Sequence, residues 1–291
     1  MSTNENLIDN MEWNNNIKNK REKEVLARKI ATKVKDGDVI SFGSGTTSFL
    51  AVKEIGKRCK AEGLNIIAIP TSNQIKLLCE YLEIKTANLG EYKIDWGFDG
   101  ADEVDSNNWL IKGLGGALYK EKMNIKETPV VYILVDKSKM VQRLGEKCPV
   151  PVECDLDNVE YISKELKRLG AIECKVRTLE GAGNYYITDN GKVIIDARFE
   201  KIEKNLEEKI DKIEGLKRIR LGSLEPKIIT EDNEIKNTTQ IFARAFVYNQ
   251  EKQLQFASQL SRILDAMDKT NELPKTILYS LKEAVLFGTT I

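Results

Sequence analysis

The sequence predicts an α/β fold in which a parallel sheet is covered by helices on both faces. Short apolar runs alternate with amphipathic helical segments through residues 19–135, and glycine-rich or polar loops separate them. The run 130–135 (VVYILV) carries no charge and is typical of a strand that is buried on both faces. With 291 residues and 41% apolar side chains, the chain is long enough to bury such a sheet.

The composition excludes several classes of protein. Lysine plus arginine and aspartate plus glutamate both total 45, so no net positive charge is available to hold nucleic acid or an anionic membrane. No apolar run approaches the ~20 residues of a membrane span, and the Asn-rich N-terminal stretch is unlike a signal peptide. We therefore expect a cytoplasmic protein with no nucleic-acid or membrane partner.

Histidine and cysteine usage limits the chemistry further. The chain has no histidine, which excludes histidine-based triads and leaves carboxylates, lysine and tyrosine to move protons. Its five cysteines form no CxxC pair and are odd in number, which argues against a disulfide framework or a structural zinc site. We expect reduced thiols, no metal and no other cofactor.

The first predicted unit is a helix, a strand, a loop and a second helix. Residues 19–35 have apolar positions at helical spacing, and the Asp36–Gly37 pair ends this helix. Residues 39–42 are strand-like, residues 43–47 (GSGTT) form a loop, and the next helix is under way by Phe49. This order places a loop of glycines and hydroxyls at the start of a helix.

Such a loop has the composition of a phosphate cradle. Two glycines let the backbone approach a ligand, the helix N-terminus attracts an anion, and two threonines add hydroxyl donors. The spacing matches neither GxGxxG nor the P-loop pattern, so a dinucleotide or P-loop site is not indicated. The alternative is a plain turn in which Thr47 or Ser48 caps the helix.

Three further strand-to-loop junctions follow along the chain. Strands at 66–69, around Trp96 and at 130–135 each lead into a polar loop. Because the carboxyl ends of parallel strands meet at one edge of a sheet, ligands gather there. Four loops are therefore expected to converge on one crevice: Ser44–Thr47, Thr71–Asn73, Asp99–Asp102 and Asp136–Lys139.

The stretch 97–123, GFDGADEVDSNNWLIKGLGGALYKEKM, is unusually rich in charges and glycines. On the simplest interpretation, Asp99 and Asp102 are turn residues, and Lys112 and Glu121 are solvated surface charges. Brought together, three carboxylates would repel one another, which tends to raise the pKa of at least one towards neutrality, where a proton shuttle works best.

Five segments occur in the order and spacing of type A ribose-5-phosphate isomerase, and the chain resembles this family. They are GSGTT after the first strand, IPTSNQ, DGADEVD, KGLGGALYKEK and VDKSKMVQRLGEKCPVPVE. The resemblance is dense over residues 20–154, weaker at 185–199 and faint thereafter. It implies an aldose–ketose isomerase of the pentose phosphate pathway that interconverts ribose 5-phosphate and ribulose 5-phosphate.

The resemblance also implies roles for individual residues. Glu121 would be the catalytic base, and Asp99, Asp102 and Lys112 would hold the sugar. The residues implied to bind the substrate and its phosphate are Ser44, Gly45, Thr46, Thr47, Gly100, Ala101, Gly113, Leu114, Gly115, Lys139 and Lys23. Two of these lysines have alternatives, because Lys139 could merely flank a helix and the KREKE run around Lys23 favours a solvated helix face.

The residue types agree with such a reaction. Aldose–ketose conversion moves a proton between C2 and C1 through an enediolate, and one carboxylate base can carry that proton along one face of the sugar. Lys112 and backbone amides of the glycine-rich turn after it could stabilise the developing oxyanion. Asp99 and Asp102 could bind hydroxyls and help to open the ring, so that no metal is required.

One residue departs from the family pattern. Family members usually have glycine at the second position after the lysine, where this chain has Leu114. If that position needs a positive φ, leucine costs about 1–2 kcal/mol and alters the turn or the substrate fit. Two alternatives therefore remain open: an isomerase of a different sugar phosphate, and a non-catalytic sugar-phosphate sensor on the same scaffold.

A smaller unit is predicted after residue 150. A strand at 150–154, a helix from Val159 to Leu169, strands at 172–178 and 184–197 and a helix at 206–213 follow one another. This β-α-β-β-α-β order is typical of a ferredoxin-like lid domain, whose return strand is expected in KRIRLGSL or EPKIIT.

The predicted organisation has three parts. A Rossmann-like catalytic domain comprises residues 17–150 and about 225–291, and a ferredoxin-like α+β domain comprises residues 151–224. The tail from 237 is expected to form a helical C-terminal extension, because apolar residues from Ile241 onward have helical spacing. We expect a homodimer or homotetramer that binds a small sugar phosphate.

Overall fold

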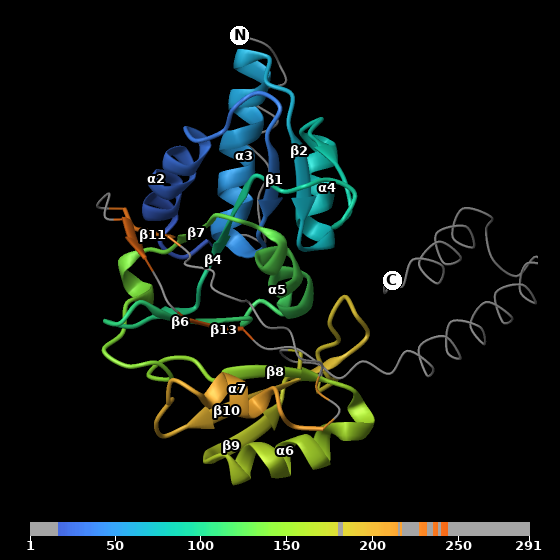
Figure 1. The fold of residues 1–291 in the computed structure, drawn as a ribbon, viewed down its shortest axis with the longest axis vertical. Helices are drawn as coiled ribbons and strands as arrows, with labels where there is room; N and C mark the ends of the chain where they lie inside the picture. The colour runs from blue at the N-terminus through green and yellow to red at the C-terminus, as the bar shows by residue number, and fades with distance from the viewer. Residues whose placement is uncertain are drawn as a thin grey trace, which may run out of the picture.

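The computed structural model describes residues 17–179, 183–214, 216, 227–231, 235–237 and 240–243. Within these residues, one seven-stranded sheet and two three-stranded sheets follow one another along the long axis of the molecule (Figure 1). The largest sheet lies at the end where the first helices pack, and one small sheet lies at the opposite end (Figure 1).

The large sheet and its helices come from the first half of the chain and from a late return. The helices are α2 (Lys20–Ala31), α3 (Gly45–Glu62), α4 (Asn73–Tyr81) and α5 (Leu118–Glu127). The strands are β1 (Val39–Phe42), β2 (Ile67–Pro70), β3 (Lys85–Thr86), β4 (Trp96–Gly100), β7 (Val131–Leu134), β11 (Lys227–Ile229) and β12 (Ile235–Asn237).

Strand order in the large sheet is β12-β11-β7-β4-β1-β2-β3, with all strands from β11 to β3 parallel and β12 antiparallel at the edge. The chain leaves β1 towards β2 and β3 and then returns to β4 on the other side of β1. This reversal opens a crevice between the loops after β1 and β4, where open α/β sheets bind ligands. The predicted α/β class with a Rossmann-like parallel sheet is confirmed.

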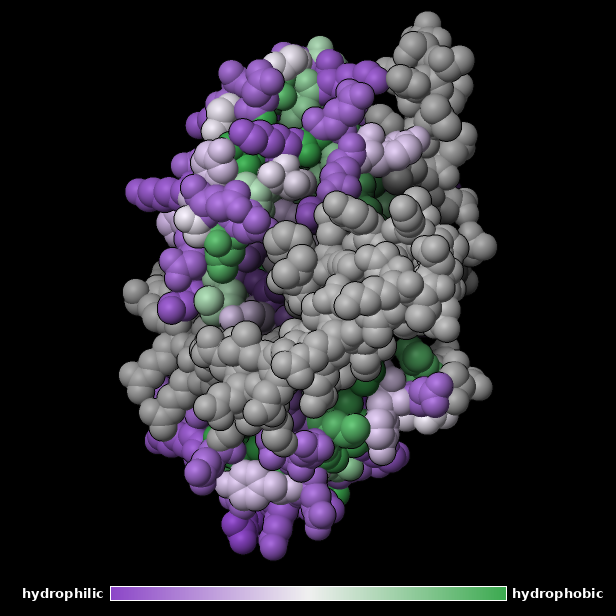
Figure 2. Space-filling model, turned by 90° about the vertical axis from the view of Figure 1, so that its right-hand side faces the viewer, coloured by the Kyte–Doolittle hydropathy of each residue, from purple (hydrophilic) through white to green (hydrophobic). Residues whose placement is uncertain are grey.

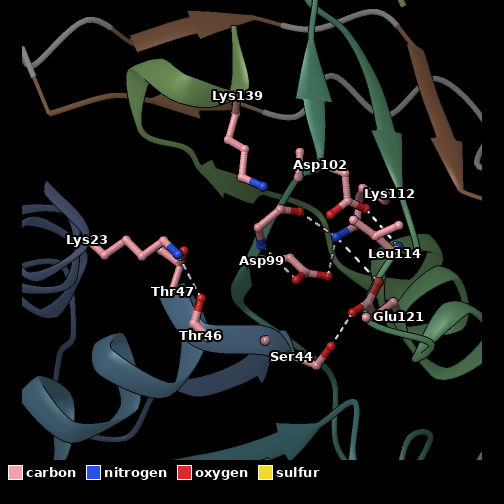
Figure 3. Close-up of a pocket in the computed structure, with 15 residues that line it drawn as sticks. Lys23, Ser44, Thr46, Thr47, Asp99, Asp102, Lys112, Leu114, Glu121 and Lys139 are labelled. Carbon is pink, nitrogen blue, oxygen red and sulfur yellow. Dashed lines mark hydrogen bonds and ion pairs between the residues drawn. The ribbon is translucent and has the colours of Figure 1, made fainter. Parts of the chain in front are cut away.

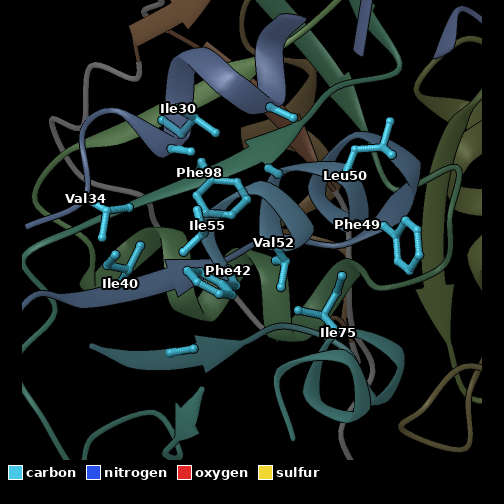
Figure 4. Close-up of a cluster of buried hydrophobic side chains, with 14 of the residues drawn as sticks. Ile30, Val34, Ile40, Phe42, Phe49, Leu50, Val52, Ile55, Ile75 and Phe98 are labelled. Atoms are coloured by element: carbon cyan, nitrogen blue, oxygen red, sulfur yellow. The ribbon is translucent and has the colours of Figure 1, made fainter. Parts of the chain in front are cut away.

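Alternation along β1 explains how helices cover both faces of the sheet. Ile40 and Phe42 point into a core that α2, α3 and α4 share, while Ser41 points the other way and accepts a hydrogen bond from Asn124 of α5. Phe42 packs on Phe98 of β4 with ring centroids 5.1 Å apart. Figure 4 shows this core between the helices and the strands.

A middle sheet joins the two ends of the molecule. It has the order β13-β6-β5, with β5 (Glu103–Val104) antiparallel and β13 (Gln240–Ala243) parallel to β6 (Trp109–Lys112). The helix expected from Ile241 onward is therefore wrong at its start, because Ile241 lies in a strand. The rest of the expected C-terminal helical extension lies outside the described residues.

The small sheet has the order β8-β10-β9 and is antiparallel. Its elements are β8 (Val150–Cys154), α6 (Val159–Arg168), β9 (Ala171–Val176), β10 (Val193–Phe199) and α7 (Leu206–Ile210). The order agrees with the first three strands of a ferredoxin-like unit. The segment EPKIIT is not its return strand, because β11 pairs with β7 in the large sheet; the other candidate, 217–224, lies outside the described residues.

Several expected boundaries differ from those of the structure, and three of them differ by four residues or more. Helix α2 ends at Ala31 instead of residue 35, because Lys33 and Val34 donate to carbonyls only three residues back and tighten the chain into a turn. Helix α3 begins at Gly45, earlier than the sequence indicated. Strand β10 begins at Val193 instead of 184, because Thr188–Lys192 forms a turn.

The face shown in Figure 2 exposes both hydrophilic and hydrophobic residues. Hydrophilic residues predominate at its upper end, and hydrophobic patches lie in its lower half. None of the described helices is long and apolar enough to span a membrane.

The predicted division into a catalytic domain (residues 17–150 and about 225–291) and a ferredoxin-like domain (residues 151–224) stays a prediction.

The buried core of α3 should contribute strongly to stability. We expect Ile55→Ala to lower the free energy of unfolding by about 2–5 kcal/mol, because Ile55 is fully buried and truncation leaves a cavity. The matched control is Leu77→Ala on α4, which is 64% exposed and should change the free energy by less than about 0.5 kcal/mol. Urea denaturation followed by circular dichroism measures both, and equal effects would contradict this description of the core.

Candidate active site

A cavity of about 320 Å³ lies at the carboxyl ends of β1 and β4. Its lining residues are the fifteen predicted from the sequence: Lys23, Ser44, Gly45, Thr46, Thr47, Asp99, Gly100, Ala101, Asp102, Lys112, Gly113, Leu114, Gly115, Glu121 and Lys139. Figure 3 shows the ten labelled residues arranged around a common space. Of the four loops expected to converge, Thr71–Asn73 does not line this cavity; Ser72 instead caps α4 by accepting from the Ile75 N–H.

Close backbone contact between β1 and β4 places the acidic loop. The Gly43 N–H donates to the Phe98 carbonyl at 2.8 Å, which continues the strand pairing beyond Phe42. A Cβ atom on Gly43 would lie 2.4 Å from the Asp99 side chain, so no larger residue fits there. Glycine at this position therefore allows the Asp99 carboxylate to turn into the cavity.

The Lys112 ammonium group lies at the centre of the charged cluster. Its Nζ atom is 2.9 Å from Asp99 Oδ2 and 3.4 Å from Glu121 Oε2, and it donates to the Gly100 carbonyl. All three charged side chains are at most 6% exposed. Lys112 is therefore held by one hydrogen bond and two ion pairs, and the buried Asp99 Oδ2 atom, although close to the ammonium group, accepts no hydrogen bond from the described residues.

Glu121 lies in the first turn of α5 and is held from two sides. Its Oε2 faces Lys112, and its Oε1 accepts a hydrogen bond from the Ser44 hydroxyl. Burial raises the pKa of Glu121 to about 7, and the Asp99 charge adds to this effect, while Lys112 and Ser44 oppose it. Ser44 is thus placed beside the carboxylate, a contact that the sequence did not predict.

The neighbouring charges respond to burial in a related way. Burial raises the pKa of Asp99, although the charge of Lys112 opposes the rise. For Lys112, burial alone would lower the pKa, but Asp99 and Glu121 outweigh it, and the pKa lies above its usual value. The ammonium group therefore keeps its charge at neutral pH and makes the buried pair of carboxyls tolerable.

Asp102 and Leu114 meet on another wall of the cavity. The Leu114 N–H donates to Asp102 Oδ2 at 2.9 Å, and the Leu114 side chain is 44% exposed. Leu114 is not among the described residues with positive φ; the turn instead uses Gly113 (φ 103°) and Gly116 (φ 86°). The conditional cost expected for leucine here therefore does not arise.

Groups suited to an anion gather at a different end of the cavity. The N-terminus of α3 presents the amides of Gly45, Thr46 and Thr47, which have no partner within the helix. Lys23 Nζ donates to Thr46 Oγ1 at 2.9 Å, and Lys139 points into the cavity from the adjacent 3₁₀ turn Lys137–Lys139 (Figure 3).

Lys23 is not a solvated surface charge. It is 7% exposed, and burial lowers its pKa, an effect that Asp136 opposes and Lys139 reinforces. The alternative of a solvated helix face for Lys23 is therefore wrong, and the two lysines with the helix N-terminus form a positive end of the cavity.

Two supporting residues escaped the sequence interpretation. Asn124 is buried one turn after Glu121 on α5 and donates to Ser41 Oγ and to the Ile69 carbonyl, which fixes the helix on the sheet. Glu103 is fully buried and accepts from the N–H groups of Gly145, Lys147 and Cys148. Nothing in the local pattern distinguishes these polar residues from surface residues, because their partners lie far along the chain.

Within the part of the chain that the structure describes, no three side chains of His, Cys, Asp or Glu lie close enough together to hold a metal ion. The polar groups that line the cavity include carboxyl, ammonium, hydroxyl and backbone amide groups.

The chain is similar to known proteins in sequence and in structure. Residues 67–219 match the family described as ribose 5-phosphate isomerase A (phosphoriboisomerase A). Ribose-5-phosphate isomerase A of Methanocaldococcus jannaschii is 39% identical over 194 residues, which are 66% of this chain and 85% of the relative. The protein of the same name from Gluconobacter oxydans is 40% identical over 198 residues, 67% and 85% of the two chains.

Solved structures agree with the sequence comparison. Ribose 5-phosphate isomerase A from M. jannaschii superimposes with a TM-score of 0.69 and 36% identity, covering 76% of this chain and 100% of the other. A D-ribose-5-phosphate isomerase in complex with phospho-erythronic acid gives a TM-score of 0.65 and 30% identity, covering 77% and 100%. By sequence and by fold, the chain belongs to the ribose 5-phosphate isomerase A family.

Proposed function

We propose that this chain interconverts ribose 5-phosphate and ribulose 5-phosphate, with Glu121 as the base that moves the proton between C2 and C1. The observation that carries the proposal is the division of one cavity into a positive end and a carboxylate end. A pentose 5-phosphate has the same division, because its phosphate lies at one end of the carbon chain and its reacting carbons at the other. Family membership supports the same reaction.

Glu121 is suited to a reversible proton shuttle. A base that takes a proton from C2 and returns it to C1 must accept and release it with similar ease, which a pKa near the working pH allows. With its pKa raised to about 7 by burial and by Asp99, Glu121 meets this requirement. The Ser44 hydroxyl and the Lys112 ammonium group fix the two carboxylate oxygens and limit their rotation.

The other charged groups support the enediolate and the sugar. Lys112 places a permanent positive charge beside Asp99 and Glu121, which stabilises negative charge that develops on the substrate oxygen. Asp99 and Asp102 face the cavity with carboxylate oxygens that can accept hydrogen bonds from sugar hydroxyls and relay the proton of ring opening.

The positive end fits the phosphate. Three helical amides, the hydroxyls of Thr46 and Thr47 and the ammonium groups of Lys23 and Lys139 provide the donors that phosphate oxygens need. A related enzyme was solved in complex with phospho-erythronic acid, a phosphorylated sugar acid, which supports a phosphorylated sugar as the ligand. Leu114 has an ordinary backbone conformation, so it gives no reason to prefer a different sugar phosphate.

Replacing the proposed base tests the function directly. The wild-type protein should interconvert the two pentose phosphates, and Glu121→Gln should lose turnover while its dissociation constant for ribose 5-phosphate stays within about tenfold, since the amide keeps the shape but not the basicity. A coupled isomerisation assay measures turnover, and isothermal titration calorimetry measures the dissociation constant.

The control is Glu127→Gln, which changes an exposed residue at the end of the same helix and should leave turnover unchanged. Turnover of Glu121→Gln above a few per cent of wild type would exclude Glu121 as the base.

The charge of Asp99 should contribute to the titration of Glu121. A neighbouring negative charge opposes ionisation, so Asp99→Asn should lower the pKa of Glu121 from its raised value of about 7. Carbon-13 NMR of the Glu121 carboxyl, recorded as a function of pH, measures the shift. Asp102→Asn should lower the same pKa by less, because Asp102 contributes less to it. An unchanged or higher pKa in Asp99→Asn would contradict the assigned cause.

Lys139 should act mainly in binding. A phosphate clamp interacts equally with the ground state and the transition state, so Lys139→Ala should raise KM for ribose 5-phosphate more than it lowers kcat. Steady-state kinetics separate the two parameters, with Lys137→Ala, an exposed lysine in the same 3₁₀ turn, as the control. Equal losses in kcat and kcat/KM would place Lys139 in the chemistry instead.

A further inference from the structure

The turn Gly113–Gly116 forms one wall of the cavity and is contacted on its outer side by the small sheet. Arg177, which directly follows β9, donates from NH1 to the Leu114 carbonyl at 2.7 Å and to the Gly113 carbonyl at 3.4 Å. Tyr186 donates its hydroxyl to the Gly115 carbonyl at 3.4 Å. The Gly113 carbonyl also accepts from the Gly116 N–H at 3.1 Å, which closes the turn, while the Leu114 and Gly115 carbonyls face the arginine and the tyrosine.

The direction of these carbonyls fixes the direction of the amides. In a planar trans peptide, the C=O and N–H groups point to opposite sides. The Gly113–Leu114 peptide follows this rule, because its carbonyl faces Arg177 and its N–H donates into the cavity to Asp102. By the same rule, the Leu114–Gly115 peptide, whose carbonyl Arg177 also holds, directs the Gly115 N–H towards the cavity.

The Gly115 N–H is a free donor on this wall, because it makes no hydrogen bond to an acceptor in the described part of the chain. Lys112 already donates to the Gly100 carbonyl and forms ion pairs with Asp99 and Glu121. An oxyanion on the substrate can therefore take a hydrogen bond from this amide without displacing a protein partner. Such a fixed backbone donor is the kind of group that stabilises developing charge most effectively.

Arg177 is itself held rigidly. Its Nε and NH2 atoms donate to the two oxygens of Asp196 on β10, with Nε at 2.8 Å, which leaves NH1 for the turn. The side chain is 13% exposed and lies near the ring of Tyr186. This use of the planar, five-donor guanidinium group is specific to arginine, because a lysine ammonium group cannot hold a carboxylate in a fork and two carbonyls together.

We infer that Arg177 is a positioning residue for the isomerase reaction: braced by Asp196, it holds the carbonyls of Gly113 and Leu114 outward and so aims the Gly115 amide at the substrate oxyanion. The inference rests on the proposed function for its chemical meaning. The small sheet thus contributes to catalysis through the turn, without any of its own side chains touching the substrate.

Variants of Arg177 test this role. Arg177→Ala should lower kcat for ribose 5-phosphate about tenfold to a hundredfold, somewhat less than outright loss of an oxyanion donor, while KM changes less than about threefold. Added guanidinium ion should restore part of the activity, which a general loss of stability would not allow. Arg177→Lys, which keeps the charge, is the second variant in case Arg177→Ala does not fold, and it should show the same loss in kcat at nearly unchanged KM.

The matched control is Arg198→Ala, which removes another arginine of the small sheet. Arg198 Nε lies 3.6 Å from Glu173 Oε2 on β9, and the Arg198 side chain is 46% exposed. Its replacement by alanine should therefore leave kcat unchanged. Hydrogen–deuterium exchange of the Gly116 amide, which donates to the Gly113 carbonyl, should become faster in the Arg177 variants and not in Arg198→Ala. This second measurement is independent of turnover.

The outcomes separate the inference from the proposed function. If the wild type turns over ribose 5-phosphate and the Arg177 variants match Arg198→Ala in kcat, the inference is overturned and the function stands. Unchanged exchange of the turn in the Arg177 variants also overturns the inference. If the wild type has no isomerase activity, the proposed function fails, and the exchange measurement alone decides whether Arg177 holds the turn.

Discussion

The burial of the Lys112 ammonium group between Asp99 and Glu121 is the interaction on which the rest of the site depends. A single charge in the protein interior costs several kcal/mol unless partners compensate for it, so these three side chains are stable only as a set. They come from the end of β4, the end of β6 and the first turn of α5. The three elements must therefore keep their relative positions closely, and Gly43 and Asn124 serve this requirement by close strand contact and by anchoring the helix.

The electrostatic arrangement also explains why one carboxyl group can be basic while the lysine stays charged. Two carboxylates compete for one buried ammonium group, and the competition is uneven because Asp99 Oδ2 lies closer to Lys112 than Glu121 Oε2 does. Burial raises the pKa of both carboxyl groups, and the charge of Lys112 opposes the rise at each of them. Glu121 thereby reaches a pKa of about 7, which suits a proton shuttle, while Lys112 stays charged.

Much of this could be predicted from the sequence because the relevant signals are local. The apolar strands, the glycine and hydroxyl loop at Ser44–Thr47 and the charged stretch around Lys112 each stand within a short window. The sheet's parallel connectivity brought the predicted residues to one edge, since strand ends at a topological switch must meet. Long-range partners left no such signal: the contact of Ser44 with Glu121 spans 77 residues, and that of Arg177 with Leu114 spans 63.

The helical spacing of apolar residues was misleading at Val34 and at Ile241. Val34 is buried and at helical spacing, yet it lies in the turn after α2, and Ile241 has the spacing of a helix but pairs in a strand. Apolar spacing reports which residues are buried, and tertiary pairing decides the backbone conformation. The homo-oligomeric state and the cytoplasmic location stay predictions.

The return of the chain from the small sheet to the large one has a consequence for folding. Strand β11 adds to the edge of the large sheet by pairing Lys227 with Tyr132 and Ile229 with Leu134, while the whole small sheet lies between these residues in the sequence. Closing so long a loop costs entropy before the pairing is gained, and the cost falls once the intervening segment is compact. The small sheet is thus expected to collapse before β11 docks, so that β11, and β12 beyond it at the edge, join the large sheet late, after the wall that supports the site has formed.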